Sequence, residues 1–429
     1  MSTVASRIKN SNTVQVTTLP NGLRVATDRM DSVETVSLGI WAGVGTRHEV
    51  LEHNGVAHLL EHMAFKGTRR RSALEIAQEI ESVGGLLNAY TGREQTAYYA
   101  KMLAEDMPLA IDVLSDILQN SVYDEAELER ERAVVLQEIG QAEDTPDDIV
   151  FDHFQETAFP DQSMGWPVLG RAEIVRSLPR DVVAGYLESR YRPERMIVAA
   201  SGKIDHAQLV DLASRLLDRL PSGALPQAEH AIYRGGEFKE QRDLEQVNVV
   251  LGFDGVGYHD PDYYAAAVLS QLLGGGMSSR LFQEVREKRG LVYSIHTFSS
   301  SYTDAGIFGV YAGTGETEAE EMMPVICDEI LKVADTLDPV EVVRSAAQLK
   351  AGTLMSREGT SSRCEQLASQ LLLYDRPIPT EEIVAKIEAV GVDDVARIAR
   401  RIFATSPTLT SLGPVSRMPS LDEVRRKLA

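Results

Sequence analysis

Cysteine is almost absent from this 429-residue chain, which contains only Cys327 and Cys364. The two residues are far apart and form no CxxC spacing, so a disulfide framework and a cysteine-based metal site are excluded. We expect two free thiols, buried or half-buried, in a reducing compartment. The cysteine content therefore favours a cytoplasmic protein.

Long apolar runs are also missing. No stretch reaches the roughly 18 consecutive apolar residues that a membrane-spanning helix needs. Residues 1–22 contain no apolar segment of the kind found in signal peptides, and they are not rich enough in arginine for a transit peptide. We therefore expect neither a membrane span nor a secretory signal.

Basic residues are in deficit. Lys and Arg total 43 against 64 for Asp and Glu, which gives a formal net charge of −21. This balance excludes nucleic acid as the main partner, because binding phosphates requires a basic face. It favours solubility and a basic or cationic partner.

The remaining composition is that of an ordinary globular protein, with 43% apolar and 25% charged residues. The chain is too long for one typical core, so we expect two domains. A segment rich in proline, glycine and charge lies near the midpoint, as interdomain linkers often do. The predicted organisation is a first domain over 1–222, a linker over 223–245 and a second domain over 246–429.

The hydrophobic patterns predict an α+β fold without strict alternation of strands and helices. Strands are expected at 36–42, 86–91, 96–102 and 195–202, and helices at 53–63, 107–120, 124–143 and 206–217. Another helix begins after Ser72, since Glu75 three residues later completes a capping box, and it ends at Gly84-Gly85.

The second half of the sequence repeats features of the first half. LGIWAGVGTRHE begins at Leu38 and LGFDGVGYHD begins at Leu251, so both contain a Gly-Val-Gly triplet. In each half an apolar helix follows, then a second helix and a strand hairpin. We interpret the chain as two duplicated half-domains.

The most specific motif is His58-Leu59-Leu60-Glu61-His62. Residues four apart on a helix lie on one face, so His58 and His62 can share one metal ion. Neutral imidazoles suit zinc, although other transition metals also bind such sites. Glu61 is placed to take a proton from water, which makes the motif an inverted form of the zincin HExxH sequence.

A catalytic zinc site usually has three protein ligands, so one more is needed. Glu131 and Glu138 are seven residues apart on the helix predicted over 124–143, and they lie on one face. Each motif alone has a simpler explanation: the histidines would form a solvated helix face, and the glutamates would be surface charges. The corresponding helix of the second half, around 265–273, has neither His nor Glu.

NGVAHLLEHMAFKGT, with GVGTRHE, LLNAYTGREQTAYYA, ERERAVVLQEI and SSRLFQEVREKRGLVYSI, resembles the pitrilysin-type inverted zinc peptidases. The similarity is greatest to the processing-peptidase branch, which includes the mitochondrial processing peptidase. The resemblance implies one zinc ion per chain, with a third ligand 76 residues after the second histidine, at Glu138. It also implies that Glu131 supports the site without being the main ligand.

The same resemblance implies a chamber built from four half-domains. This chain supplies two, so a dimer closing like a clamshell is expected. Relatives use an Arg and a Tyr seven residues apart to contact the scissile carbonyl and its oxyanion, a role for which both are suitable donors. Arg286 and Tyr293 have this spacing, and we predict a homodimer in which they complete the partner's zinc site. Alternatively, they are an ion-paired Arg at a helix end and a core Tyr.

Substrate contacts are implied at two further places. Asn88, Ala89 and Tyr90 match an edge strand that pairs with an extended peptide. Alternatively, they belong to an ordinary hairpin strand, which would have the same sequence pattern. Asp148 and Asp152 match acids that bind a substrate arginine, or else form a solvated helix face. The triplet at 274–276 is a flexible loop or a helix terminator, and it lacks the ending of a phosphate-binding loop.

The sequence thus predicts a zinc endopeptidase that acts on short or unfolded peptides, with a preference for arginine-containing, presequence-like substrates. His58, His62 and Glu138 would hold zinc, and Glu61 would transfer protons. The alternative is a non-catalytic structural or partner subunit of a peptidase or respiratory complex. A metal-binding protein without hydrolytic activity is a third interpretation.

Overall fold

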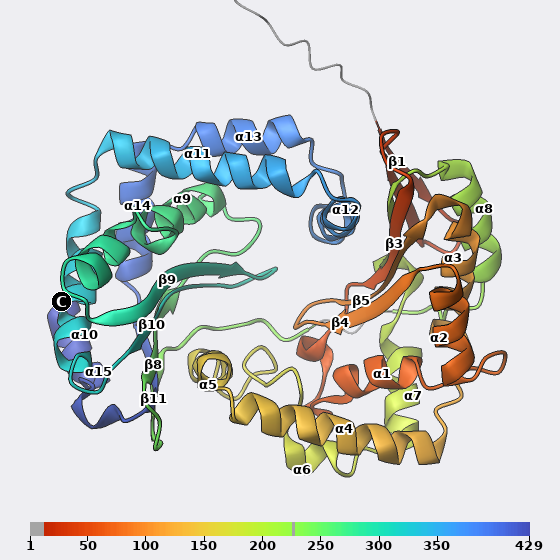
Figure 1. Ribbon diagram of the computed structural model, residues 1–429, viewed down its shortest axis with the longest axis horizontal. Coiled ribbons are helices and arrows are strands. Elements are labelled where there is room, and N and C mark those ends of the chain that lie inside the picture. Colours follow the sequence, from red (N-terminus) through yellow and green to blue (C-terminus); the bar gives the residue numbers. More distant parts are fainter. Residues whose placement is uncertain (1–12, 225–227) are drawn as a thin grey trace, which may run out of the picture.

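A computed structural model describes residues 13–224 and 228–429 of the chain, which form two α+β halves (Figure 1). Residues 1–12, part of the segment in which no signal peptide is expected, and residues 225–227 of the predicted linker lie outside these ranges. Within the described ranges, no helix is long and apolar enough to cross a membrane. Both cysteines are free and buried, as predicted.

The first half is built on a six-stranded mixed sheet. Its strand order is β1-β2-β6-β3-β5-β4, so β4 is an edge strand. Only β2 and β6 run parallel, and the other neighbours are antiparallel. The strands are β1 (Val14–Thr18), β2 (Arg24–Arg29), β3 (Thr35–Ala42), β4 (Leu86–Thr91), β5 (Thr96–Leu103) and β6 (Met196–Gly202).

The second half repeats this topology strand for strand. Its order, β7-β11-β8-β10-β9, corresponds to β2-β6-β3-β5-β4, and β7 and β11 form the parallel pair as β2 and β6 do. Its strands are β7 (Gly236–Gln241), β8 (Val247–Asp254), β9 (Val292–Ser301), β10 (Gly306–Thr314) and β11 (Thr408–Gly413). The equivalence of β2–β6 with β7–β11 confirms the duplicated α+β halves, and β1 is an addition to the first sheet.

The linker predicted over 223–245 differs from the structure, because β7 lies within it. This strand pairs in parallel with β11, so the second sheet begins before residue 246. Its sequence, GEFKEQ, has half-buried residues alternating with exposed ones. Charged side chains are common on edge strands, and here they give the strand the composition of a linker.

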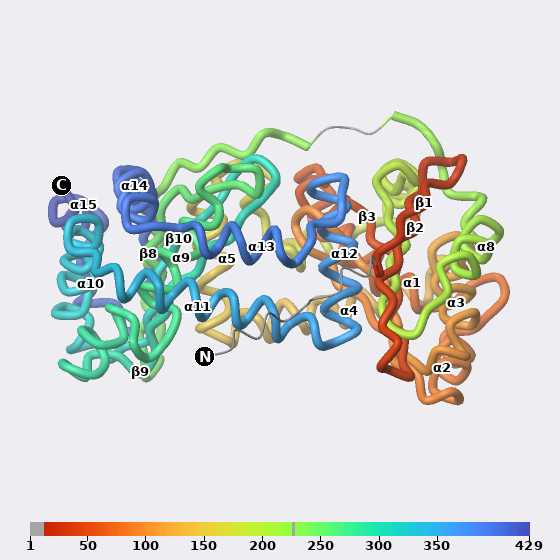
Figure 2. The backbone as a smooth tube through the Cα atoms, turned by 90° about the horizontal axis from the view of Figure 1, so that it is seen from above, coloured from red at the N-terminus to blue at the C-terminus, as the bar shows by residue number. Residues whose placement is uncertain are grey.

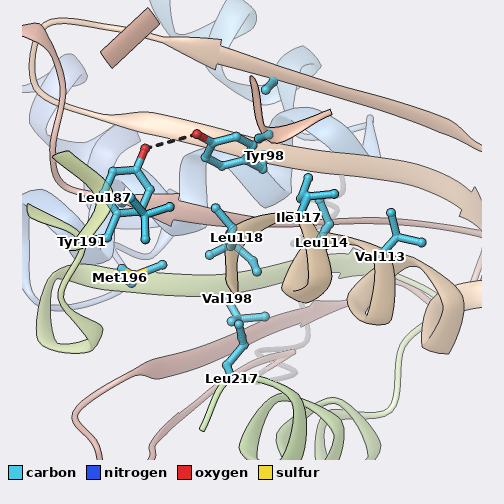
Figure 3. Packing of buried hydrophobic residues seen from close by; sticks show 14 of the residues in the cluster. Tyr98, Val113, Leu114, Ile117, Leu118, Leu187, Tyr191, Met196, Val198 and Leu217 are labelled. Carbon is cyan, nitrogen blue, oxygen red and sulfur yellow. Dashed lines mark hydrogen bonds between the residues drawn. The ribbon is translucent and has the colours of Figure 1, made fainter. Parts of the chain in front are cut away.

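Helices cover one face of the first sheet. These are α1 (Val56–Ala64), α2 (Ala73–Ser82), α3 (Met107–Gln119), α7 (Arg180–Arg190) and α8 (His206–Leu216), with α4 (Glu125–Glu143) and the short α6 (Ala172–Val175) beyond α1. The predicted capping box is present, since the Ser72 hydroxyl accepts from the Glu75 amide and the Glu75 carboxylate accepts from the Ser72 amide. Figure 3 shows the core beneath, where the Tyr98 and Tyr191 hydroxyls lie 3.3 Å apart among leucine and valine side chains.

Helix α1 begins three residues later than the sequence predicts. Residues 51–53 form a separate 3-10 turn, and Gly55 then adopts a left-handed conformation with φ of 95°. Most residues avoid that conformation, whereas glycine adopts it at little cost. The chain therefore turns at Gly55 before the helix that carries His58.

The second half has its own helical layer. It contains α9 (Tyr263–Gly274), the short π-helix η5 (Phe282–Glu287), α10 (Ala319–Val333), α11 (Pro339–Ser356), α13 (Thr380–Glu388), α14 (Val392–Phe403) and α15 (Leu421–Leu428). Helix α9 ends at Gly274, and Gly275 is its C-cap. The structure therefore agrees with the helix-terminator interpretation of the glycine triplet.

The two halves exchange one helix each. Helix α5 (Pro146–Ala158) packs on β7, β8 and β11 of the second sheet, and α12 (Thr360–Tyr374) packs on β2, β3 and β6 of the first sheet. Figures 1 and 2 show α12 beside the first sheet, reached through the long helix α11. Each sheet is thus covered by its own helices on one face and by a helix of the other half on the opposite face.

Candidate metal centre

Helices α1 and α4 bring together the three residues predicted to bind metal. The Glu138 Oε2 atom lies 3.7 Å from His58 Nε2 and 3.5 Å from His62 Nε2. One potential ligand atom from each of the three residues lies within 4.8 Å of the other two. The spacing of four residues on α1 therefore places both imidazoles opposite one carboxylate, as the sequence predicts.

These separations fit a zinc ion. In a tetrahedral site with bonds of about 2.0–2.1 Å, two ligand atoms lie about 3.3–3.4 Å apart. Burial, together with the neighbouring His62, lowers the pKa of His58 to about 4, so its imidazole is neutral at pH 7. Neutral imidazoles and a carboxylate are zinc ligands, and the three residues could hold zinc with a fourth position free.

The two histidines differ in what their second nitrogen contacts. The His62 Nδ1 atom lies 3.0 Å from Glu131 Oε2, and Lys66 Nζ lies 2.8 Å from the other oxygen of that buried carboxylate. In the part of the chain that the structure describes, the buried His58 Nδ1 atom has no hydrogen-bond partner. Glu131 is thus placed to orient one imidazole, a common arrangement around metal sites.

Glu61 lies beside this cluster and contacts the edge strand. The Thr91 hydroxyl, at the end of β4, donates a hydrogen bond of 2.6 Å to Glu61 Oε2. Burial is the main cause that raises the pKa of Glu61; the nearby Glu138 adds to it, and the Thr91 hydrogen bond opposes it. A carboxylate with a raised pKa is well suited to accept and return a proton near neutral pH.

A second buried carboxylate holds the start of α1. Glu49 Oε1 accepts from the Ala57 amide at 2.8 Å, while Oε2 accepts from the Gly55 amide at 3.0 Å and from Asn54 Nδ2 at 2.9 Å. Amide groups in the first turn of a helix lack partners within it, so an acid here fixes the position of the helix.

Sequence reasoning missed three of these residues: Lys66, Thr91 and Glu49. Lys66 follows His62 by four residues but lies beyond the end of α1 at Ala64, so helical spacing alone does not place it beside Glu131. Thr91 is brought to Glu61 only by the packing of β4 on α1. Glu49 lies six residues before Gly55, a spacing that matches no common capping pattern.

The predicted peptide-pairing residues lie on the edge strand β4. Asn88 is exposed, and its Oδ1 accepts a hydrogen bond of 2.8 Å from the Ala89 amide. The Tyr90 hydroxyl donates to Glu365 of α12 at 3.1 Å and accepts from Gln95 at 2.8 Å. The structure thus places these residues at a free sheet edge that ends beside Glu61.

Asp148 and Asp152 lie one turn apart on α5. Asp148 is exposed. The Asp152 side chain is 35% exposed and lies 3.5 Å from Arg93 Nη2, while burial raises its pKa. Asp152 is therefore already close to an arginine of its own chain.

Arg286 and Tyr293 lie in the second half, on η5 and β9. The guanidinium carbon of Arg286 lies 4.9 Å from the centroid of the Phe282 ring and 5.8 Å from that of Tyr293. Tyr293 is 74% exposed, so the interpretation as a core tyrosine is wrong. Figure 1 shows β9 on the opposite side of the molecule from α1.

Comparison with known proteins shows that the chain matches two models of one peptidase family. The family model described as insulinase, peptidase family M16, matches residues 24–172, and the peptidase M16 inactive domain matches residues 177–349. The first match contains the HLLEH motif, and the second contains α9, the corresponding helix that has neither His nor Glu.

Individual relatives cover nearly the whole chain. An uncharacterized zinc protease of Streptomyces coelicolor is 40% identical over 94% of this chain and 90% of its own length. The mitochondrial-processing peptidase subunit beta of Mus musculus is 37% identical over 96% of this chain and 86% of its own. A chain of the complex III2 structure from Candida albicans has the same fold, with a TM-score of 0.87 at 24% identity, covering 97% of this chain and all of its own. The chain therefore belongs to peptidase family M16.

Proposed function

We propose that this protein is a zinc-dependent endopeptidase that cleaves short or unfolded peptides. The observation that carries the proposal is the convergence of His58, His62 and Glu138 at zinc-ligand spacing, with Glu61 on the same helix turn. Relatives that are zinc proteases support the metal and the general chemistry. The activity and the role of each residue belong to the proposal.

In the proposed mechanism, His58, His62 and Glu138 would hold a zinc ion, which would lower the pKa of water and polarise a carbonyl group. Glu61 takes a proton from the attacking water and later gives it to the leaving amine. Thr91 fixes the carboxylate through its hydrogen bond, and Glu131 fixes the ring of His62.

The peptide would pair with the free edge of β4, at Asn88, Ala89 and Tyr90. Main-chain pairing of this kind tolerates many sequences, and it requires an extended substrate. Asp148 supplies an exposed carboxylate for a substrate arginine. Asp152 would have to exchange its contact with Arg93 for one with the substrate, so it contributes less to the proposed preference.

A homodimer is part of the proposal. Arg286 and Tyr293 are neighbouring donors on the second half, and they lie apart from α1 of their own chain. In a two-fold dimer they would reach the metal centre of the partner and stabilise the oxyanion of the cleaved peptide bond. Mixing His58→Ala chains with Arg286→Ala chains should restore part of the activity. Mixed dimers without recovery would exclude this sharing.

Glu61→Gln tests the peptidase proposal directly. The variant should retain zinc and lose cleavage of an arginine-containing, presequence-like peptide by about 10³-fold or more. Glu52→Gln, at an exposed glutamate in the turn before α1, is the matched control and should cleave normally. Cleavage by zinc-loaded Glu61→Gln protein would overturn the assignment of Glu61.

The same assay separates the alternative functions. If the protein is a non-catalytic subunit or only binds metal, the zinc-loaded wild-type protein will leave every peptide intact. The complete donor set favours the enzyme. The cytoplasmic location expected from the cysteine content stays a prediction.

A further inference from the structure

A cavity of about 430 Å³ lies beside the edge strand β4, between α12 and the sheet of the first half. It lies on the opposite face of the sheet from α1. The residues that line it include Trp41, Leu86, Tyr90, Tyr99, Lys101 and Glu365. Together they come from three strands of the first half and from a helix of the second half.

The cavity exists because α12 covers only part of the sheet. This helix packs on β2, β3 and β6, and the next strands toward the edge are β5 and β4. The Trp41 ring lies over Gly39, where a Cβ atom would approach the ring to 2.7 Å. The indole therefore occupies the space above Gly39, and the cavity lies between it and β4.

The lining has the character of an apolar side-chain pocket. Tyr90 and Tyr99 pack against the buried cluster that contains Trp41, and Leu86 at the strand start is 69% exposed. Lys101 and Glu365 bring one charge of each sign, so the lining has no net charge to attract an ionic group. Large apolar side chains, aromatic ones above all, gain most from such a surface.

The position of the cavity identifies its occupant. Leu86, Asn88 and Tyr90 line the cavity, and so does Leu87, although Leu87 packs against the core cluster on the other face of the sheet. The intervening residues face α1, and the last of them, Thr91, contacts Glu61. A peptide strand added to the free edge would lie about 4.8 Å from β4 and share this alternation. Every second side chain would therefore point toward the cavity.

We propose that this cavity is a side-chain subsite for large apolar residues of a peptide that pairs with β4. The inference rests on the proposed function, because it requires a peptide on that edge. It adds a rule to the proposed specificity: preference for bulky apolar residues should recur at every second position of the substrate. Intervening positions, whose side chains face the other way, should not share it.

A positional scan tests the subsite. In a peptide cleaved at one bond, phenylalanine replaces alanine at each position in turn, and kcat/KM is measured. Substitutions at one alternating set of positions should raise kcat/KM about tenfold, and those at the other set should change it less than twofold. The same labelled peptides, bound to the zinc-loaded Glu61→Gln protein, give affinities that do not depend on cleavage.

Two variants connect the preference with the cavity. Leu86→Glu places a charge in it and should abolish the preference for phenylalanine while the alanine peptide is still cleaved. Leu74→Glu is the control, since Leu74 is 65% exposed on α2 and does not line the cavity. Lys101→Trp places a large side chain from β5 in the cavity, and it should have the same effect as Leu86→Glu.

The outcomes distinguish the two proposals. Cleavage without an alternating preference, or with one that both cavity variants leave intact, would overturn the subsite and leave the peptidase function standing. Alternating binding without cleavage by the wild-type protein would support the subsite and exclude the peptidase function. Absence of both would overturn both.

Discussion

Helices α1 and α9 follow equivalent strands, β3 and β8, and differ in what they carry. Helix α1 presents His58 and His62 to Glu138 of α4, and Glu61 to Thr91 of β4. Helix α9 has none of these residue types, and Ala266, Val268 and Leu269 are buried along it. The comparison shows that the fold needs only an apolar helix at this place, so folding alone does not account for His58, Glu61 and His62 in α1.

The loops before these helices are alike in both halves. A Cβ atom on Gly45 would lie 2.1 Å from the Gly92 carbonyl oxygen, and one on Gly257 would lie 3.0 Å from the Tyr302 carbonyl oxygen. Both contacts join the loop after the second strand of the repeat, β3 or β8, to the turn of the following hairpin. The shared Gly-Val-Gly triplet therefore maintains a backbone contact that both halves use.

The edge strands extend the comparison. Strands β4 and β9 occupy equivalent edges, one leading to Glu61 and the other carrying Tyr293 next to Arg286. In the proposed dimer, the second half supplies Tyr293 from β9, the strand that corresponds to the proposed peptide-pairing strand β4, and Arg286 from the neighbouring η5.

Replacing a predicted metal ligand on α1 should abolish activity, whereas a substitution on the equivalent helix α9 should not. We expect His58→Ala to lower peptide hydrolysis by about 10⁴-fold or more and to remove bound zinc, because the metal activates the water. Gln271→Ala, at a half-buried position of α9, should leave activity and zinc content within about twofold of wild type. Activity and metal analysis check both variants, and a comparable loss in Gln271→Ala would show that the second half takes part in the chemistry.

The exchanged helices make the stability of each half depend on the other. Phe154 of α5 is 1% exposed and packs on Gly252 of the second sheet. Phe154→Ala should reduce the free energy of unfolding by about 3–5 kcal/mol through loss of packing and a residual cavity. Hydrogen exchange should speed up in β8 and β11, as well as in α5. Exchange confined to α5 would contradict this coupling.

Leu371→Ala on α12 provides the reciprocal test. Leu371 is 1% exposed against the first sheet, and its truncation should cost about 2–4 kcal/mol, with faster exchange in β3 and β6. Val343→Ala, at a 69% exposed position of α11, is the control and should change stability by less than about 0.5 kcal/mol.

Acid should weaken the two halves over different pH ranges. His48 and Asp260 each follow the last glycine of the triplet by three residues. Burial lowers the pKa of His48 to about 4 from an ordinary 6.5, so the unfolded chain binds the extra proton first. Stability is therefore lost as the pH falls from 6.5 to 4, by about 2–3 kcal/mol.

Asp260 behaves differently, because its hydrogen bonds with Arg401 and the Asp262 amide outweigh burial and lower its pKa below the ordinary 3.8. The stability it contributes is present above 3.8 and is lost below that pH. Urea unfolding between pH 7 and 4 should show a shallower decline in His48→Asn than in wild type. An unchanged slope in that variant would exclude His48 as the source.

The smallest expected effect concerns the orientation of His62. Glu131→Gln should weaken zinc binding by about 10- to 100-fold, as is typical when the hydrogen-bond partner of a metal-bound histidine is altered. Glu129→Gln, whose side chain is 70% exposed on the same helix, should bind zinc normally. Chelator competition measures both, and equal affinities for all three proteins would show that Glu131 does not tune the site.

The sequence predicted local structure well wherever the hydrophobic periodicity and the capping residues indicate the same element. The strand over 86–91 matches β4, and the helices over 107–120 and 124–143 match α3 and α4 within one residue at each end. The ligand pair on α1 follows from helix geometry alone, and the resemblance identified Glu138. Amphipathic periods and i, i+4 spacing are properties of a single element, so they can be read before the fold is known.

Features that depend on packing between distant segments were not predicted. Strand β7 has the composition of a linker, and only its pairing with β11 makes it part of a sheet. The helix exchange leaves no periodic signal, because α5 and α12 look like any amphipathic helix. Thr91 is ordinary in sequence, and the approach of β4 to α1 alone gives it a role beside Glu61.

The exchange of α5 and α12 bears on the origin of the chain. A single ancestral half, with its outer helix packed on another copy, would form a domain-swapped dimer, and fusion of the two copies would produce the present arrangement. Splitting the chain between β6 and β7 should therefore give fragments that expose the sheet face covered by the missing helix. Such fragments should recover a native fold only by reassociating, which would make the duplicated halves one folding unit despite their repeated topology.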